Sequence, residues 1–372
     1  MLVVVSDFDD HALIVYITQG SPHCQDGGGL IADSKESIIR MYLKFIVLAA
    51  FYVFVCLPLV ACSEDLSETR EKAQQGDAAA QLSLGIMYDN GEGVSQSFEQ
   101  AAKWYQKAAK QGDAVAQFNL GNTYYNGDGV RQSYEKSFKW YRKAAKRGHE
   151  VAQFNLANMY DNGEGVPQDD IKAFKGYRKA AQQGFSKAQY NLANMYYKGR
   201  GVSLDYERAI QWYRKAAQQN YAKAQNNLGR AYQQGLGVTE NYQKAAKWYR
   251  KSAEQGYAKA LSNLGFMYQN GLGVPRDDKQ AVTLFRKAAE HGNTVAHFNV
   301  GVMFQNGRGV PQSYKRAVEW YRKAAQQGVA NAQHNLGFMY AEGQGVLQNY
   351  VLAHKWFNLA AARGYSKAKK MA

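Results

Sequence analysis

Cysteine is almost absent from this chain of 372 residues and is missing from most of its length. The three cysteines, Cys24, Cys56 and Cys62, all lie within the first 62 residues, so no disulfide framework can join the rest of the chain. Proline is also scarce, with five in total. Proline therefore interrupts few helical stretches.

Motifs of familiar catalytic chemistry are missing as well. The sequence has no Gly-x-Ser-x-Gly, no His-Glu-x-x-His, no phosphate-binding loop, and no cysteine nucleophile after residue 62. His297 and His334 would form a poor metal site, because neither a carboxylate nor a thiol accompanies them. We predict that the protein is not an enzyme and that it holds no cofactor and no metal.

Acidic side chains are outnumbered by basic ones, 31 against 46, which gives a net charge of +15. The first 62 residues hold three basic and six acidic side chains, so the remainder carries a net charge of +18. Such a body favours acidic proteins, anionic lipid head groups or envelope polymers as partners.

A block of 36 residues recurs eight times from Gly76 to Arg363 without insertion or deletion. Each copy contains a Leu-Gly pair or a close variant, such as Leu120-Gly121, followed by Gly-x-Gly-Val. A fixed period of this length is typical of a stacked solenoid, whose surfaces usually bind other molecules.

The second helix of each repeat, helix B, is predicted to begin after a residue with a short polar side chain that caps free backbone N–H groups. These caps are Ser97, Ser133, Asp169, Asp205, Asn241, Asp277, Ser313 and Asn349. Helix B should end where a residue adopts a left-handed conformation, at Gly112 and its equivalents and, in one repeat, at Asn220.

The first helix, helix A, is predicted from apolar residues spaced by four, Ala80, Leu84 and Tyr88 in the first repeat. It should stop at Gly91, where Gly-x-Gly-Val turns into helix B. Prolines inside the repeats occur only in this turn, at positions 167, 275 and 311.

The pattern Ala-x-Ala-Gln-x-x-Leu-Gly-x-x-Tyr, then Gly-x-Gly-Val, then Ala-x-x-Trp-Tyr-x-Lys-Ala-Ala-x-x-Gly resembles the Sel-one-like repeat (SLR) family, a branch of the tetratricopeptide-like α-solenoids. The resemblance covers residues 76–363. It implies an all-α, right-handed superhelical solenoid of eight helix-turn-helix repeats that acts as an adaptor or scaffold, often exported in bacteria. Gly176 and Leu284 depart from the pattern by replacing the tryptophan of helix B, and Leu261 replaces the glutamine, so we expect looser stacking there.

The ends of the array continue its pattern. Residues 63–75 are interpreted as a linker followed by a partial capping helix, because Glu68 to Gly76 align with the end of a helix B. Residues 364–372 supply only part of a ninth helix A.

Residues 41–62 resemble a bacterial lipoprotein signal peptide. Lys44 precedes an apolar run, and Leu59-Val60-Ala61-Cys62 resembles a lipobox, which implies that Cys62 is lipidated. The alternative is an uncleaved membrane anchor. Arg40 and Lys44 before the run, and Glu64 and Asp65 after it, predict that the repeats are exported to the periplasm or cell surface in either case. Residues 1–40 are interpreted as upstream sequence before a true start at Met41, or as a disordered segment.

Two rows of side chains should lie on the exposed side of helix A, which we expect to be the concave side of the solenoid. The first row is Asn119, Asn155, Asn191, Asn227, Asn263, Asn299 and Asn335; the second row is Asn122, Asn158, Asn194, Arg230, Phe266, Val302 and Phe338. Carboxamides can hold the backbone of an extended peptide. The alternative for the first row is hydrogen bonding within the stack, whereas the second row varies and is the better candidate for selecting a partner.

A basic ridge should run along helix B. It consists of Arg142, Lys143, Arg178, Lys179, Arg214, Lys215, Arg250, Lys251, Arg286, Lys287, Arg322 and Lys323. These residues are either solvated side chains or a docking surface for anionic membrane or peptidoglycan.

The sequence therefore predicts a lipid-anchored, exported scaffold that binds a protein or peptide on its concave face. The alternative is an envelope-binding protein that uses the basic ridge, and nucleic acid is a poor candidate for an exported protein. A remote alternative comes from the resemblance, since some cysteine-rich relatives bind or hydrolyse β-lactams, but the paired cysteines that mark them are missing.

Overall fold

The computed structural model describes residues 57–365, with side chains from residue 66 onward. Within this range it contains 17 α-helices, α2 to α18, and no strand, which confirms the all-α fold. The predictions for residues 1–40, for most of the signal peptide, and for the end of the chain after Tyr365 lie outside the described residues. Among the described helices, none has the length and apolar character needed to span a membrane.

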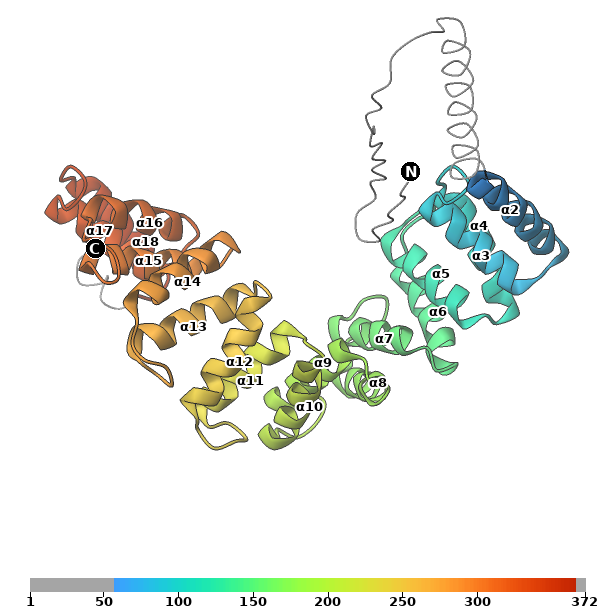
Figure 1. Cartoon of the computed structure of the whole chain (residues 1–372), viewed down its shortest axis with the longest axis horizontal. Coiled ribbons are helices and arrows are strands. Elements are labelled where there is room, and N and C mark those ends of the chain that lie inside the picture. Colours follow the sequence, from blue (N-terminus) through green and yellow to red (C-terminus); the bar gives the residue numbers. More distant parts are fainter. Residues whose placement is uncertain (1–56, 366–372) are drawn as a thin grey trace, which may run out of the picture. The chain divides into compact units, whose positions relative to one another are not determined.

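Each repeat forms a helical hairpin, and successive hairpins follow one another from α3 to α18 (Figure 1). The A helices are α3 (Ala78–Asn90), α5 (Ala114–Asn126), α7 (Glu150–Asn162), α9 (Ser186–Lys198), α11 (Ala222–Gln234), α13 (Ala258–Asn270), α15 (Thr294–Asn306) and α17 (Ala330–Glu342). The B helices are α4 (Phe98–Gln111), α6 (Tyr134–Lys146), α8 (Asp170–Gln182), α10 (Tyr206–Gln218), α12 (Tyr242–Glu254), α14 (Asp278–Glu290), α16 (Tyr314–Gln326) and α18 (Tyr350–Ala362). The main helix contacts join elements adjacent in the chain, as a solenoid requires.

The eight predicted caps of the B helices are confirmed. In α8, for example, the Asp169 carboxylate accepts a hydrogen bond of 2.9 Å from the backbone N–H of Lys172. The predicted ends are confirmed too: Gly91 ends α3 in a left-handed conformation, with φ 76°. Among the described residues, Asn220 is the one non-glycine residue with positive φ, at 61°.

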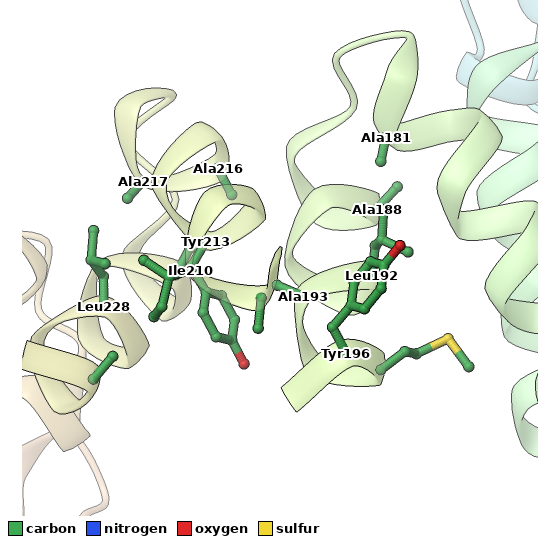
Figure 2. Packing of buried hydrophobic residues seen from close by; sticks show 14 of the residues in the cluster. Ala181, Ala188, Leu192, Ala193, Tyr196, Ile210, Tyr213, Ala216, Ala217 and Leu228 are labelled. Carbon is green, nitrogen blue, oxygen red and sulfur yellow. The ribbon is translucent and has the colours of Figure 1, made fainter. Parts of the chain in front are cut away.

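The core consists of several clusters of small and large apolar residues between neighbouring helices. Figure 2 shows part of it, where Leu192 of α9 and Leu228 of α11 lie on either side of Tyr213 of α10. Alanines on the B helices, such as Ala216, let the helices approach closely. A single hairpin cannot bury its apolar surface by itself. Stacking against the neighbouring repeats buries that surface and stabilises the hairpin.

Buried glutamines add polar contacts between successive repeats. The Gln117 side chain of α5 donates a hydrogen bond of 3.1 Å to the backbone carbonyl of Ala109 at the end of α4. Where Leu261 replaces this glutamine it is buried against Ala288 and Ala289, so an apolar contact takes the place of the polar one.

α2 (Leu57–Gln75) precedes the first repeat, and the segment predicted as a capping helix is its final part. Ala73 in its last turn is buried and accepts a hydrogen bond of 3.1 Å from the Gln81 side chain of α3. The last turn of α2 thus reproduces the contact that a complete B helix makes with the following A helix.

Candidate functional site

A row of buried tyrosines on the B helices determines the structure of the exposed side of the A helices, which we call the helix A face. Its members are Tyr105, Tyr141, Tyr177, Tyr213, Tyr249 and Tyr321, all almost fully buried. Each has a Gly or Ala of its own A helix beside it; a Cβ on Gly121 would lie 2.5 Å from the ring of Tyr141. A residue with little or no side chain at this point therefore lets the ring pass, so that the tyrosine hydroxyl reaches the helix A face.

The tyrosine hydroxyls hydrogen-bond to the predicted second row where that row is asparagine. Tyr141 donates to the Asn122 side-chain oxygen at 2.6 Å and Tyr177 donates to that of Asn158 at 2.7 Å. Tyr213 makes the equivalent bond with Asn194. These three asparagines are half-buried, so they are part of the internal hydrogen bonding of the hairpin.

The first row bonds to the same hydroxyls from the next repeat. Burial raises the pKa of Tyr321 to about 12, while a hydrogen bond from Asn335 opposes the rise. Equivalent bonds join Asn119 to Tyr105, Asn155 to Tyr141, Asn191 to Tyr177 and Asn227 to Tyr213. Asn263 instead donates to the Asn226 side chain at 3.0 Å, and Asn299 is half-buried. Six members of this row therefore link one repeat to the next, five through a tyrosine hydroxyl and Asn263 through Asn226.

The second row changes character in the later repeats. Arg230 lies with its guanidinium 5.1 Å from the ring centre of Tyr197, and Val302 is half-buried. Phe266 and Phe338 are 45% and 36% exposed. In these two repeats Phe285 and Phe357 replace the tyrosine, so no hydroxyl there needs an acceptor.

A third row of polar residues, one turn further along the A helices, was not predicted. The Asp89 carboxylate accepts a hydrogen bond of 3.0 Å from Tyr105, and Gln233 accepts one of 2.7 Å from Tyr249. The signal was available in the sequence, since these residues follow the second row by three positions, which places them on the same side of a helix.

Between the first two repeats the helix A face forms a polar pocket of about 200 Å³. Asn119 and Asn122 from the two predicted rows both line it, together with Asn126, Asp89 and Asp128. The structure thus brings the two rows together with two carboxylates at the N-terminal end, whereas Phe266 and Phe338 give the C-terminal end an apolar surface.

The residues of the predicted basic ridge lie on the surface, but many of their side chains have partners within the stack. Lys143 lies with its ammonium 4.1 Å from the ring centre of Trp140, and Lys215 lies 4.3 Å from that of Trp212. Arg250 and Arg322 donate to the hydroxyls of Tyr268 and Tyr340, at 3.1 and 3.0 Å. All twelve ridge residues are exposed except Arg286, which is half-buried.

The two histidines considered above are packed against aromatic rings. His297 lies 5.6 Å from Trp320 and His334 lies 5.4 Å from Phe357, between ring centres. Burial lowers the pKa of His297. Within the described part of the chain, no group of three or more His, Cys, Asp or Glu residues is placed to hold a metal ion.

The chain belongs to the Sel1 repeat family, whose repeat matches residues 78–113, 114–149, 151–185, 186–221, 222–257, 258–293, 294–329 and 330–365. The predicted family and its eight repeats are thus confirmed, with the first boundary two residues later than the one we chose at Gly76. Sel1 repeat proteins generally mediate protein–protein interactions and are generally scaffolds without enzyme activity.

The solved structures that are similar to this chain include two that are themselves SLR or Sel1 repeat proteins with at least 30% sequence identity. One is c5321, a protective antigen present in uropathogenic Escherichia coli strains that displays an SLR fold; it is 40% identical, with a TM-score of 0.75 over 82% of this chain. This chain spans 65% of the length of c5321. The other is a Sel1 repeat protein from Oxalobacter formigenes, 32% identical, with a TM-score of 0.65, covering 84% of this chain and 92% of that one. No curated protein matches the chain.

Proposed function

We propose that this protein is an exported scaffold that binds a protein or peptide partner on its helix A face. The observation that carries this proposal is the exposure of Phe266 and Phe338 on one row of that face. Exposed aromatic side chains set among polar ones are typical of interaction surfaces. They are also free of the hydrogen bonds that the earlier asparagines of the same row make.

The chemistry of this face changes along the array. The polar pocket with Asp89 and Asp128 suits backbone N–H groups or a basic side chain of the partner, because carboxylates accept strong hydrogen bonds. The later repeats offer Phe266 and Phe338 to an apolar segment. An extended peptide that crosses several repeats would therefore bind in one direction only.

The face is tested by replacing Phe266→Asp and Phe338→Asp together and by crosslinking the protein to its partners in cells. We expect the double variant to lose partners that the unchanged protein captures. A matched control is Ile171→Asp with Val351→Asp, two apolar residues on B helices that are 56% and 80% exposed. Each lies in a first helical turn, where a carboxylate is well tolerated. An identical set of crosslinked partners in both variants would overturn the proposed face.

Membrane attachment is proposed to depend on a lipid on Cys62, as the lipobox-like sequence before it favours. Metabolic labelling with a palmitate analogue should mark the unchanged protein and leave Cys62→Ala unmarked. The alternative, binding of anionic envelope components, is favoured by the exposed ridge. If the ridge carries the attachment, high salt should release the protein from the envelope; release only in Cys62→Ala assigns the attachment to the lipid.

A further inference from the structure

Six of the eight B helices carry a tryptophan at the same position, half-buried against the neighbouring helices. These are Trp104, Trp140, Trp212, Trp248, Trp320 and Trp356. In five of these helices a lysine three residues later covers the indole: Lys107 lies 3.8 Å from the centre of the Trp104 ring, as Lys143 and Lys215 do for theirs at 4.1 and 4.3 Å. In the eighth repeat Leu359 stands at this position. This position in the repeat is therefore built to hold an indole beneath a cation.

In the third repeat residue 176 is glycine, and the missing side chain leaves a surface pocket of about 220 Å³. Ala145 of α6, Leu156 and Tyr160 of α7 and the Gly176 backbone of α8 line it. Lys179, the counterpart of Lys143 and Lys215, stands at its edge, where its own helix offers no ring beneath it.

Apart from Gln153, the rest of the pocket wall is basic. Arg142, Lys146, Lys172, Lys175 and Lys179 all line it, and no carboxylate does. Lys172 pairs with Asp169 at 2.8 Å, which leaves a clear excess of positive charge around the apolar floor. A ligand that fits this arrangement has a flat apolar group with negative charges next to it.

The sixth repeat provides a comparison inside the same chain. Leu284 replaces the tryptophan there and borders a cavity of about 430 Å³. Its lining contains Glu254 and Glu290 beside Arg250, Lys287 and His291. Carboxylates in the wall repel an acidic ligand. The sixth repeat therefore lacks the basic site of the third repeat, although it has lost the same tryptophan.

We propose that the pocket at Gly176 binds an aromatic side chain from an acidic segment of a partner protein. The ring occupies the place that tryptophan fills in six other repeats, and Lys179 stacks on it. Lys146 and Lys175 pair with the carboxylates on either side of the ring. The site is formed mainly by B helices and stands independently of the partner proposed for the helix A face.

The test uses the full chain and unlabelled capped peptides in isothermal titration calorimetry. We expect Asp-Glu-Trp-Glu-Asp to bind with one site per chain. Replacing its tryptophan by alanine should weaken binding at least tenfold, and lysine flanks in place of the acids should abolish it. Equal binding of the tryptophan and alanine peptides would overturn the role of the pocket, and so would the absence of binding by any acidic aromatic peptide.

Filling the pocket provides the decisive variant. Gly176→Trp is combined with Ala157→Gly, because a Cβ on residue 176 would lie 2.8 Å from the Ala157 Cβ; the pair then matches Gly121 and Trp140 of the second repeat. We expect at least a tenfold loss of peptide affinity, with the melting temperature unchanged or raised. Leu284→Trp, the matched control in the sixth repeat, should leave the affinity unchanged.

The charged rim is tested by Lys146→Gln with Lys175→Gln, which the chain itself tolerates at the equivalent Gln182 of the third repeat and Gln211 of the fourth. We expect about a tenfold loss of affinity and a weaker dependence on salt. Unchanged affinity in the filled variant overturns the site. Indole-3-acetate that binds as tightly as the peptide would overturn the assignment to a protein partner and indicate a small aromatic acid.

Discussion

The buried tyrosines of the B helices show how a single hydroxyl group holds several elements of the array together. The Tyr177 hydroxyl shares its proton between the Asn158 side-chain oxygen at 2.7 Å and the Asp161 carboxylate at 3.1 Å, both in its own hairpin. It also receives a hydrogen bond from Asn191 of the next hairpin. A polar group buried among apolar side chains is stable only when it is paired. The asparagines that the sequence suggests as ligand-binding residues therefore pair buried tyrosine hydroxyls within the stack.

Tyr177→Phe tests this network. Phe285 and Phe357 stand at the same position in other repeats, so the ring should fit without distortion. We expect a loss of about 1–3 kcal/mol in the free energy of unfolding, because the amides of Asn158 and Asn191 lose their partner. Urea denaturation followed by circular dichroism measures the loss. An unchanged midpoint would mean that the hydroxyl contributes nothing to the stack.

His149 is a residue whose pKa depends on its surroundings in the folded protein. Its Nδ1 accepts a hydrogen bond of 3.2 Å from the backbone N–H of Ala152 and its ring stacks on Phe118, with 4.5 Å between ring centres. Burial lowers its pKa below the ordinary 6.5, against the opposing effect of Glu150 and Asp113. The unfolded chain therefore binds the proton more readily than the folded one.

As the pH falls below about 6.5, stability should consequently be lost, and above it His149 contributes no pH dependence. His149→Asn removes this contribution but keeps an acceptor, as Asn293 does at the start of α15. We expect the unchanged protein to lose more stability than His149→Asn between about pH 7.5 and pH 5.5. Denaturation midpoints at both pH values measure the difference, and parallel pH profiles would contradict the prediction.

At the scale of the helix, capping residues decide where each element begins and ends. The turn after α10 is the informative one, because Asn220 takes a left-handed conformation, with φ 61°, where glycine stands in other repeats. Its side-chain oxygen accepts hydrogen bonds of 3.0 Å from Gln225 and 3.1 Å from Gln255. The side chain thus compensates for the strain of its backbone.

Asn220→Ala should be more harmful than Asn220→Gly. Alanine keeps the unfavourable backbone, which costs about 1–2 kcal/mol, and also loses both hydrogen bonds. Glycine loses the bonds but relieves the strain, so we expect a smaller change. Thermal melts of the two variants beside the unchanged protein give the order, and equal melting temperatures would show that strain at this turn is unimportant.

At the scale of the molecule, each repeat within residues 57–365 is stabilised mainly by contacts with the repeats next to it. The main helix contacts are between elements adjacent in the chain, and the core is divided into several clusters, of which one extends from Ala157 to Met267. A solenoid of this kind loses structure locally when one repeat is damaged.

Leu192→Ala tests how far a local loss of stability extends along the array. Leu192 is fully buried in α9, and its loss should cost about 2–5 kcal/mol. We expect faster hydrogen exchange in α8 to α11 with little change in α16 to α18, as measured by mass spectrometry of peptides from each helix. A uniform increase along the array would show instead that the repeats unfold as one unit.

Much of the fold and part of the candidate site could be predicted from the sequence. Asp169 and its equivalents predict helix starts because capping depends on the cap and the next three residues. The partners of Asn158 and the stacking of Lys143 on Trp140 could not be predicted, because they depend on which side chains a neighbouring helix brings close. The substitution at Gly176 was noticed as a departure from the pattern, but only the structure shows a pocket there, lined by five cations.

The sequence by itself determined the period, the helix boundaries and the family, since these rest on local backbone preferences repeated at fixed spacing. Tertiary structure alone decided which exposed residues are already bonded within the stack and which are available to a partner. The physical reason is that a polar group is satisfied by whatever lies within hydrogen-bonding distance. For Asn122 that is Tyr141 of the adjoining helix, whereas Phe266 and the pocket at Gly176 remain open.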